Sequence, residues 1–538
     1  MTPAVRFFCI ASLLWLPLSL WCLFSATGGS ASVSALLAHP WPLTVAVLGI
    51  LYVLIGLHDL FISHSNLRRN YPVIANLRYL FEFIRPEIRQ YFIASNLEES
   101  PFNREARDLI YRRAKALNDT LAFGTEHDLV EDGYLTVFHS IKATHVPQHH
   151  ARLTFGGPQC SKPYSASLFN ISGMSFGALS PNAIEALNKA AHIGKFFHNT
   201  GEGSISPHHL KYGGDLVWQI GTGYFGCRHL DGTFNDEAFA ANAARDVVKM
   251  IEIKISQGAK PSHGGVLPGA KVTPEIARIR LVEVGKTVVS PPRHPEFETP
   301  EEMLAFIKRV RDLSGGKPTG FKLCIGRKVE FMAMVKAMLS TGILPDFITV
   351  DGAEGGTGAA PMEFTNRLGL TCLEATYFVH QVLTGAGLRD NIRIISAGGT
   401  ASGFDILSKI AVGADSVNSA RAMMIALGCV QSKTCNTNKC PTGVATQDPV
   451  RNRAIDVDSK ALRVANYHKG TVFAFLELCG ALGYDSPALL KPSDLFRRME
   501  GGLRHFDQIF TPLSPGQLLT SSIPDQYADW QRASPSSF

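Results

Sequence analysis

The sequence predicts an α/β protein whose body is a (β/α)8 TIM barrel, preceded by two membrane-spanning helices and a helical connecting module. In the body, residues 151–470, short β-like runs alternate with glycine-rich loops and helical stretches. That alternation is typical of a parallel sheet, and the number of units suits a closed barrel better than an open sheet. Ahead of the body, residues 7–58 contain no Asp, Glu, Lys or Arg, and residues 66–150 are charged and mostly helical in pattern.

Composition limits the classes of protein to consider. The chain has 538 residues, of which 45% are hydrophobic and 18% charged, so global disorder is excluded. The net charge of +6 is spread along the chain without a long Lys/Arg run, which argues against a nucleic-acid partner. Ten cysteines are too few for a disulfide scaffold in a chain of this length.

Residues 1–65 are expected to form a helical hairpin in a membrane. Two apolar runs, at about 7–26 and 41–62, each have the ~20 residues that a bilayer-spanning helix needs. The turn-rich stretch GGSASVSALLAHP between them is too polar to continue either helix. The alternative is a cleaved signal peptide with Arg6 and the small residues of SASVSA, but the second run would remain hydrophobic after cleavage.

Arginines flank the hairpin at both of its ends. Arg6 precedes the first run, and five arginines follow the second: Arg68, Arg69, Arg78, Arg85 and Arg89. Because positive charge favours the cytoplasmic side, both ends are predicted to face the cytoplasm. The expected location is therefore the inner (cytoplasmic) membrane, as a multi-pass protein whose catalytic domain faces the cytoplasm.

Residues 66–150 are predicted to be a helical module that connects the hairpin to the body. Residues 104–121 show apolar positions at three- and four-residue spacing, and Asn103 is placed to cap that helix. At the other end of the chain, residues 471–538 are expected to form C-terminal helices and a flexible tail, because the last residues are rich in Ser, Pro and Gln.

Six β-like runs in the body are each followed by a glycine-rich or polar loop. They are SLFNISGMSF, MIEIKIS, TGFKLCI, DFITVDG, IRIISAGG and DSVNSA. In a (β/α)8 barrel the C-terminal ends of the strands build the active site, so residues just after each run are the functional candidates. The segment GTGYFG (221–226) fits the dinucleotide-binding pattern GxGxxG, but no helix follows it, and we interpret it as a loop.

Three cysteines in the segment GCVQSKTCNTNKCPTG indicate an iron–sulfur cluster. Cys429, Cys435 and Cys440 have the spacing C-x5-C-x4-C, and Pro441 follows the third. Thiolates on a short irregular loop, 429–440, can converge on one cluster, whereas zinc prefers CxxC knuckles and four ligands. Three cysteines favour [3Fe-4S], and a remote thiol such as Cys479 would complete a [4Fe-4S] cluster instead.

Two late strand ends indicate a phosphate site. Gly398 and Gly399 follow the buried run IISA and precede a helix, and Ser419, Ala420 and Arg421 end the next run. Backbone N–H groups at such strand-to-helix turns bind anions, and TIM barrels bind phosphates on the loops after their late strands.

Two earlier strand ends suit a flavin ring. After Asp351, the glycine-rich segment DGAEGGTGAAP includes Gly355 and Gly356, which would let a flat ring lie against backbone. Lys322 ends the run TGFKL and is expected near the flavin N1/O2 edge, where negative charge develops on reduction. Taken with the phosphate site, these positions favour FMN as the cofactor.

At these residues the sequence closely resembles the FMN-binding synthase domain of glutamate synthases. The matching segments cover roughly residues 155–450: GMSFGALSPNAIEALNKAA, NTGEG, EIKISQGAKP, LPGAKVT, SPP, DGAEGGTGAAP and CPTGVATQ. The two apolar runs and the segment RYLFEFIRPEIRQYF also resemble a stand-alone, membrane-attached branch of that family.

The resemblance implies the residues of the site. The implied FMN shell is Gly173, Met174, Ser175, Gln257, Lys322, Asp351, Gly355, Gly356, Gly398, Gly399, Ser419, Ala420 and Arg421. Lys260 and Arg280 are implied as catalytic partners of the carboxylates of 2-oxoglutarate, because a dicarboxylate needs charge-assisted hydrogen bonds, and Lys322 is the third catalytic candidate. Cys429, Cys435 and Cys440 are implied as ligands of a [3Fe-4S] cluster that passes electrons to FMN.

The resemblance also implies a reaction, the FMN-dependent reduction of 2-iminoglutarate to L-glutamate. The imine forms from 2-oxoglutarate and ammonia. No pyridine-nucleotide or ferredoxin site is readable, so the electron donor is unidentified. The glutaminase domain of the large glutamate synthases has no counterpart in this sequence, and ammonia is expected to be free or to come from a separate glutaminase subunit.

Two of the departures from the family pattern remove a Glu and a Gln. The family's QGAKPGEGGQLPG reads QGAKPSHGGVLPG here, so that His263 replaces a Glu and Val266 replaces a Gln. Together with the membrane hairpin, these changes favour an alternative function. In it, the protein is a membrane-attached FMN/iron–sulfur oxidoreductase that acts on a different substrate with a membrane electron carrier.

Overall fold

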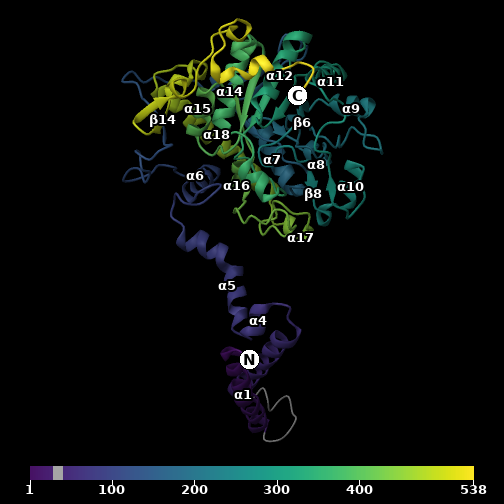
Figure 1. Ribbon diagram of the computed structural model, residues 1–538, viewed down its shortest axis with the longest axis vertical. Coiled ribbons are helices and arrows are strands. Elements are labelled where there is room, and N and C mark those ends of the chain that lie inside the picture. The colour runs from purple at the N-terminus through teal and green to yellow at the C-terminus, as the bar shows by residue number, and fades with distance from the viewer. Residues whose placement is uncertain (28–39) are drawn as a thin grey trace. The chain divides into compact units, whose positions relative to one another are not determined.

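The structure is a computed structural model that describes residues 1–27 and 40–538 (Figure 1). It divides into two compact units, Met1–Ser95 and Asn96–Phe538. The predicted connecting module is therefore split between the two units, with its second part belonging to the barrel unit. The predicted connector GGSASVSALLAHP lies, except for its last residue, outside the described residues.

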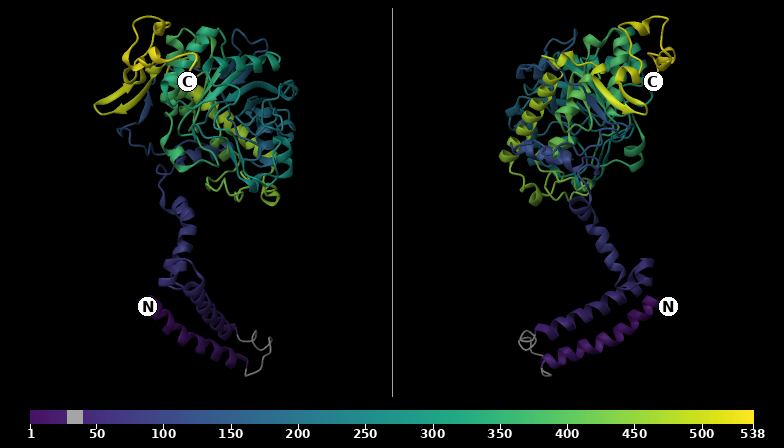
Figure 2. Two further views of the ribbon diagram at one scale, coloured as in Figure 1. Left: turned by 45° about the vertical axis from the view of Figure 1, so that its right-hand side comes forward. Right: turned by 90° about the vertical axis from the view of Figure 1, so that its left-hand side faces the viewer.

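The N-terminal unit is built on two long apolar helices that lie side by side (Figure 2). They are α1 (Pro3–Thr27) and α3 (Pro40–Leu57), and a π-helical turn, η1 (His58–Ile62), ends the second. Small residues allow the close approach: a Cβ on Gly49 would collide with the Ser19 hydroxyl, and one on Gly56 with the ring of Phe8. Both helices are long and apolar enough to cross a membrane, and membrane insertion itself stays a prediction.

After η1, the described part of this unit contains α4 (Asn66–Asn70) and α5 (Ala75–Ile88), and α5 ends in a π-helical turn, η2 (Arg89–Ile93). The buried carboxylate of Asp59 connects η1 to the start of α5. It accepts hydrogen bonds from the Val73 backbone N–H at 2.9 Å and from the Asn76 side-chain amide at 2.6 Å. The start of α5 is therefore fixed to the end of the second apolar helix.

Eight parallel strands close into a barrel in the second unit, which confirms the predicted architecture (Figure 1). In chain order they are β4 (Phe169–Ile171), β5 (His198–Asn199), β6 (Leu216–Ile220), β7 (Val248–Lys254), β10 (Thr319–Leu323), β11 (Phe347–Asp351), β12 (Arg393–Ala397) and β13 (Ser416–Ser419). Each strand pairs with the next in this order, and β13 closes the barrel on β4, with Val417 opposite Phe169. All the strand ends that carry predicted site residues therefore meet at one rim.

The six predicted β-like runs correspond to β4, β7, β10, β11, β12 and β13. The other two strands were missed. β5 is only two residues long, and β6 is buried along its whole length, so it shows no alternation of polar and apolar residues.

Helices surround the barrel and cover its outer face. The main ones are α7 (Pro181–Gly194), α9 (Asp236–Ala243), α11 (Pro300–Leu313), α12 (Lys328–Thr341), α14 (Cys372–Gly385), α15 (Gly403–Ala411), α16 (Arg421–Leu427) and α18 (Val457–Ala481); short ones include α8 (Pro207–Leu210), α10 (Pro274–Arg280) and α17 (Pro449–Asn452). α7 illustrates why they form: the Ser180 hydroxyl caps its first turn by accepting from Ala183 N–H, Pro181 begins it, and Ile184 and Leu187 are fully buried.

Helix α6 (Arg104–Ala114) belongs to this second unit and packs on α16 and α18. The predicted cap is confirmed, because Asn103 accepts a hydrogen bond from the Ala106 backbone N–H at 2.9 Å. The helix ends at Ala114 and not at residue 121 as expected. Ile110 and Ala114 are fully buried, so α6 is part of the core of the barrel unit.

The prediction for residues 471–538 is wrong in two respects. The expected boundary at 470 falls inside α18, and the segment beyond it forms a β-hairpin, β14 (Leu495–Met499) and β15 (Gly502–His505), which pairs with β1 (Leu135–Val137). The expected flexible tail instead packs on the barrel unit, because Tyr527 and Trp530 are 1% and 5% exposed in the same core cluster as the barrel residues Ile251 and Phe321.

Candidate active site

A cleft open to solvent lies at the C-terminal ends of the barrel strands, and its volume of about 530 Å³ includes that open space. Of the residues predicted for the FMN shell, all except Met174 and Ser175 line it. The lining residues that the sequence did not predict are Phe102, Ser172, Ala259, Ala397, Thr400 and Asn418. The alternation of strands and loops in the sequence thus predicts most of this cleft.

Glycines leave the wall of the cleft open to a ligand. Gly398 and Gly399 have φ angles of +142° and +56°, which favour glycine. A Cβ on Gly356 would lie 3.0 Å from the guanidinium of Arg421, and a Cβ on Gly173 would lie 2.9 Å from the amide nitrogen of Gln219. A phosphate needs accessible backbone N–H groups, and a flat ring needs a wall without side chains, so these residues fit FMN.

The buried carboxylate of Glu252 hydrogen-bonds to the side chains that lie next to Gly173. Glu252, on β7, accepts hydrogen bonds from the side chains of Asn199 at 2.8 Å, Gln219 at 2.5 Å and Thr349 at 2.7 Å. These donors come from three other strands of the barrel, β5, β6 and β11. A fully satisfied buried network of this kind fixes the positions of its members and hence of the backbone above it.

Lys322 and Asp351 form an ion pair inside the cleft, with Nζ and Oδ2 3.3 Å apart. Asp351 also accepts a hydrogen bond from the Gly258 backbone N–H at 2.9 Å. Burial opposes the charge of Lys322, but Asp351 and Glu252 outweigh it and raise the pKa of Lys322 above its ordinary value. The cleft therefore contains a side chain that is cationic at neutral pH, of the kind expected beside a flavin N1/O2 edge.

Phe102 reaches the cleft from outside the barrel. Its ring lies against Arg421, with the guanidinium carbon 5.3 Å from the ring centroid. The amide side chain of Gln431 fixes its backbone: Oε1 accepts from Phe102 N–H at 3.2 Å, and Nε2 donates to the Phe102 carbonyl at 2.9 Å. The segment before the barrel thus contacts both the cleft and the cysteine loop.

A second, smaller pocket adjoins the first, and Gln257 lines both. The second pocket is shallow and open to solvent, and its volume of about 270 Å³ includes that open space. Glu202 and Lys254 line it as an ion pair, with Oε1 and Nζ 2.7 Å apart, and His263 lines it as well. Glu202 and Lys254 were not among the predicted site residues, although both lie in segments that resemble the family.

Lys260 and Arg280 lie near this pocket and are both buried. Lys260 Nζ donates to the carbonyl of Gly264, which lines the pocket, at 2.9 Å. Arg280 donates to the carbonyl of Phe176 at 2.7 Å, and its Nε is buried without a hydrogen-bond partner among the described residues. Neither side chain lines the empty space itself, so their direct contact with a substrate stays a prediction.

The ionisable side chains around the second pocket shift one another's pKa values. Burial lowers the pKa of Lys260 to about 8 and that of Arg280 to about 10, and Glu202 partly offsets both shifts. Burial alone would raise the pKa of Glu202, but Lys254, Lys260 and Arg280 together lower it. Three cations thus surround one ionised carboxylate, which leaves the pocket with an excess of positive charge.

Of the two residues that replace the family's Glu and Gln, His263 lines the pocket and Val266 does not. His263 lines the pocket, with its Nδ1 3.0 Å from the Gly264 carbonyl and its ring edge-on to Phe364 at 5.3 Å. Val266 begins the short strand β8 (Val266–Leu267), where it pairs with Val289. His263 is therefore the residue of the two that a bound substrate would meet.

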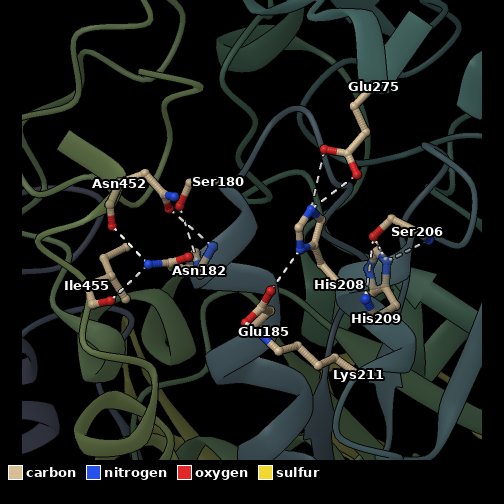
Figure 3. Close-up of polar contacts among 11 residues, drawn as sticks. Ser180, Asn182, Glu185, Ser206, His208, His209, Lys211, Glu275, Asn452 and Ile455 are labelled. Atoms are coloured by element: carbon tan, nitrogen blue, oxygen red, sulfur yellow. Dashed lines mark hydrogen bonds and ion pairs between the residues drawn. The ribbon is translucent and has the colours of Figure 1, made fainter. Parts of the chain in front are cut away.

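A polar cluster positions the helix that carries Arg280 (Figure 3). His208, on α8, lies between two carboxylates: its Nδ1 is 2.9 Å from Glu185 Oε1 on α7, and its Nε2 is 3.4 Å from Glu275 Oε1 on α10. Lys211 pairs with the same Glu185 at 2.7 Å. Since α10 ends at Arg280, this cluster helps to fix the position of the arginine relative to α7.

Backbone donors surround the predicted cluster ligands in the loop 429–440. Burial alone would raise the pKa of Cys440, but the backbone N–H groups of Ala445, Thr442 and Val444, with the Thr442 hydroxyl, lower it. Burial and then the neighbouring thiols of Cys435 and Cys440 raise the pKa of Cys429 to about 11. These donors stabilise the thiolate of Cys440, the form that ligates an iron–sulfur cluster, whereas burial raises the pKa of Cys435 as it does that of Cys429.

The geometry of the loop does not by itself establish a metal site. In residues 1–27 and 40–538, no three His, Cys, Asp or Glu side chains lie together in a way that would hold a metal ion. The loop is nevertheless anchored close to the cleft: a Cβ on Gly358, in the loop after β11, would lie 3.3 Å from the Cβ of Cys435. The [3Fe-4S] cluster stays a prediction.

Contacts on α7 also hold the chain that leaves the cysteine loop (Figure 3). The Asn182 backbone N–H donates to Asn452 Oδ1 at 3.1 Å, and its side-chain amide donates to the Ile455 carbonyl at 3.1 Å. Lys271 adds a buried ammonium that donates to the carbonyls of Ala178 and Ala445, both at 2.9 Å. The loop is therefore tied to the barrel at its C-terminal end.

Comparison with known proteins identifies the family of the chain. Residues 150–485 match the family described as a conserved region in glutamate synthase. The glutamate synthase large subunit-like protein YerD of Bacillus subtilis (strain 168) is 36% identical over 506 residues, which cover 86% of this chain and 96% of that protein. The archaeal glutamate synthase (NADPH) of Methanocaldococcus jannaschii is 36% identical over 317 residues, 59% of either chain.

A solved structure of a flavocytochrome b2 double mutant with pyruvate bound aligns at a TM-score of 0.42 and 14% identity, covering 78% of this chain and 85% of that one. That similarity carries no argument here.

The family match spans more than half of the chain, and the similarity to YerD extends over most of both proteins. The glycine-walled cleft and the buried Lys322 occur where the family's cofactor residues were expected. The chain therefore belongs to the FMN-binding glutamate synthase family and is an oxidoreductase of the class that acts on CH–NH2 donors.

Proposed function

We propose that the protein reduces 2-iminoglutarate, formed from 2-oxoglutarate and ammonia, to L-glutamate at the junction of the two pockets. The observation that carries this proposal is that Gln257 lines both the glycine-walled cleft and the pocket with excess positive charge. A ligand in the second pocket therefore lies next to a ring held in the first. That proximity is what transfer between cofactor and substrate requires.

The charges of the second pocket match the substrate. 2-Oxoglutarate carries two carboxylates, and Lys254, Lys260 and Arg280 supply three cations with buried side chains. Glu202, ionised among them, offers a carboxylate to the N–H groups of the imine. Ammonia adds to the 2-oxo carbon, water leaves, and the resulting carbon–nitrogen double bond gains two electrons and two protons to give the amino acid.

Bound FMN supplies the two-electron reduction of that double bond. Gly398, Gly399 and Arg421 would hold its phosphate, and Gly173 and Gly356 would leave room for its ring. Lys322, cationic at neutral pH because of Asp351 and Glu252, would stabilise negative charge at the N1/O2 edge. Asp351 and the network around Glu252 hold Lys322 and the backbone under the ring in place.

Electrons are proposed to reach FMN through a [3Fe-4S] cluster on Cys429, Cys435 and Cys440. The contact between Gly358 and Cys435 supports this route, because it connects the cysteine loop to the loop after β11 that lines the cleft. The donor is unidentified, and the names of the archaeal-type relatives include NADPH. Ammonia is proposed to be free or to be delivered by a separate glutaminase subunit.

The protein is further proposed to be attached to the inner membrane by α1 and α3, with its catalytic unit in the cytoplasm. The length and hydropathy of these helices and the arginines that follow them support this location. A membrane carrier would then be within reach as an electron partner.

A second candidate is an FMN/iron–sulfur oxidoreductase that acts on a different substrate with a membrane electron carrier. The observation that favours it is His263, which lines the pocket where the family pattern has a Glu. A ring that is neutral or cationic there changes both the shape and the charge that a substrate meets.

A panel of 2-oxo acids separates the two candidates. Purified protein reduced anaerobically is mixed with 2-oxoglutarate, pyruvate, oxaloacetate or 2-oxoisovalerate, each with and without ammonium, and reoxidation of the flavin is followed by its visible absorbance. Ammonium-dependent reoxidation by 2-oxoglutarate alone supports the first candidate. Reoxidation by another acid, or by a quinone without ammonium, supports the second and contradicts the first.

A further inference from the structure

An exposed apolar stripe runs along α5 and η2 in the N-terminal unit. Apolar side chains recur at helical spacing on one face: Leu77, Leu80, Phe81, Ile84, Ile88 and Phe92. Leu77 is 52% exposed, Phe81 60% and Phe92 84%. In the part of the chain that the structure describes, nothing covers these three side chains.

Arginines lie along one flank of this stripe. Arg78, Arg85 and Arg89 follow one another at seven- and four-residue spacing, which places them on one side of the helix. The acidic residues of α5 are Glu82 and Glu87, and the Arg78–Glu82 pair is loose, at 3.9 Å, and exposed. The helix thus combines an apolar face with a basic flank.

The start of α5 is fixed at the end of the apolar hairpin. Besides the contacts of Asp59, the Tyr79 hydroxyl lies 2.7 Å from Ser65 Oγ, and the guanidinium carbon of Arg68 lies 4.5 Å above the Tyr79 ring. From that point α5 runs in a different direction from α1 and α3 (Figure 2). If the hairpin crosses a bilayer, α5 begins where the second helix leaves it and does not continue the span.

We infer that residues 75–93 form a membrane-surface helix that binds anionic phospholipid. The stripe enters the boundary between headgroups and acyl chains, and Arg78, Arg85 and Arg89 extend from the flank to the headgroup phosphates. Amphipathic helices with aromatic and aliphatic residues on one face and basic residues beside it bind membranes in this way. The inference rests on the membrane attachment proposed above and adds a lipid-binding surface to it.

Charge and continuity favour lipid over a protein partner. The stripe continues from two helices that are themselves apolar and exposed, and a basic flank complements phosphate better than it complements a second copy of the same basic helix.

Site-specific photocrosslinking of the full chain tests the inference. The protein is reconstituted in nanodiscs of phosphatidylcholine and phosphatidylglycerol with benzoylphenylalanine at one position, Phe81→benzoylphenylalanine, on the stripe. The matched control is Glu82→benzoylphenylalanine, one residue on and on the polar face. We expect phospholipid adducts, identified by mass spectrometry, at position 81 and at least five-fold fewer at position 82.

The arginines are tested by combining the crosslinker at position 81 with Arg78→Gln, Arg85→Gln and Arg89→Gln. We expect the ratio of phosphatidylglycerol to phosphatidylcholine adducts to fall at least three-fold, with FMN content unchanged as evidence of folding. An unchanged ratio contradicts the assignment of the arginines to headgroup phosphates.

Three results would overturn the inference: no lipid adduct at position 81, equal lipid adducts at positions 81 and 82, or an adduct at position 81 with this chain or another protein in place of lipid. Carbonate extraction of cell membranes separates this failure from failure of the proposed attachment. If the chain remains in the membrane pellet while position 81 gives no lipid adduct, only the surface helix is wrong. If the chain is released, the attachment itself is wrong.

Discussion

The guanidinium carbon of Arg421 lies 5.3 Å from the centroid of the Phe102 ring. Arg421 begins α16 at the rim of the barrel, whereas Phe102 lies before residue 150, where the family match begins. The buried ring lines one side of the cleft, and the backbone of Phe102 is held by the side chain of Gln431 from the cysteine loop. Phe102 therefore connects the segment ahead of the barrel, the cleft and the predicted cluster loop.

Phe102→Ala should weaken FMN binding. The substitution removes a cation–π contact worth ~1 kcal/mol and the ring that shields the cleft, so the Kd for FMN should rise about five-fold or more. Fluorescence titration of the apoprotein with FMN measures it. Phe473→Ala, at a half-exposed position on α18, is the control and should leave the Kd unchanged. An unchanged Kd in Phe102→Ala would exclude a role for the ring in the cofactor site.

Gly399→Val should abolish FMN retention while leaving the fold intact. Gly399 has a φ of +56° and lines the cleft, so a branched side chain would block the phosphate site. Gly387→Val is the matched control, because Gly387 has a φ of +70°, does not line the cleft, and has no atom within 4 Å of the position that a Cβ would take. Both variants should lose similar stability in thermal unfolding, about 1–2 kcal/mol, and only Gly399→Val should purify without flavin. Equal flavin content in the two would contradict the placement of the phosphate.

Cys435→Ser should remove the iron and acid-labile sulfide of the protein while most FMN is retained. A hydroxyl is a poor ligand for the cluster, and the barrel does not depend on the loop for its closure. Metal and sulfide analysis of anaerobically purified protein measures it. Cys479→Ser tests the four-iron alternative, since loss of iron in that variant would indicate a fourth thiolate ligand from α18. Normal iron and sulfide in Cys435→Ser would rule out the predicted ligand set.

The affinity for 2-oxoglutarate should fall as the pH rises through about 8. Burial lowers the pKa of Lys260 to about 8, so its ammonium, which the carboxylate needs, is lost above that pH. Between pH 8 and the ordinary lysine pKa, Lys260 is protonated in the unfolded chain and largely unprotonated in the folded one. Because the unfolded state binds more protons there, the free energy of unfolding should rise with pH over this range. The KM measured from pH 6.5 to 9.5 should increase on the alkaline side.

Two variants isolate the origin of that pH dependence. Lys260→Arg keeps its charge over the whole range and should flatten the alkaline limb. Lys317→Met is the matched control, because burial lowers the pKa of Lys317 to about 8 as well, but its ammonium donates to the carbonyls of Ala243 and Arg245 outside the site. If Lys317→Met changes the limb and Lys260→Arg does not, Lys260 is not the titrating group.

The sequence predicted the barrel and most of the flavin cleft because both follow from local signals. A buried run followed by a Gly pair, as at Ile394–Gly399, is readable from neighbouring residues, and the barrel then brings such ends together. Phe102 gave no such signal, since it lies far from Arg421 in the chain. The pairing of Glu202 with Lys254 was missed for the same reason, because it depends on which strand ends are neighbours.

The β-hairpin near the C-terminus could have been predicted from the sequence. Residues 495–505 read LFRRMEGGLRH, in which two short runs flank a Gly–Gly turn, the pattern of a β-hairpin. The expectation of a flexible tail relied on Ser, Pro and Gln and gave too little weight to Tyr527 and Trp530, whose burial contributes large apolar area. The partner strand β1 lies hundreds of residues upstream and could not have been found from local pattern.

The most direct test of the proposed reaction is a single turnover with labelled ammonium. Anaerobically reduced protein is mixed with 2-oxoglutarate and [15N]ammonium, flavin reoxidation is followed by stopped-flow absorbance, and the quenched products are analysed by chiral chromatography and mass spectrometry. The account predicts one L-[15N]glutamate for each pair of electrons that leaves the protein. Flavin that stays reduced, or that reoxidises without forming labelled L-glutamate, would contradict it.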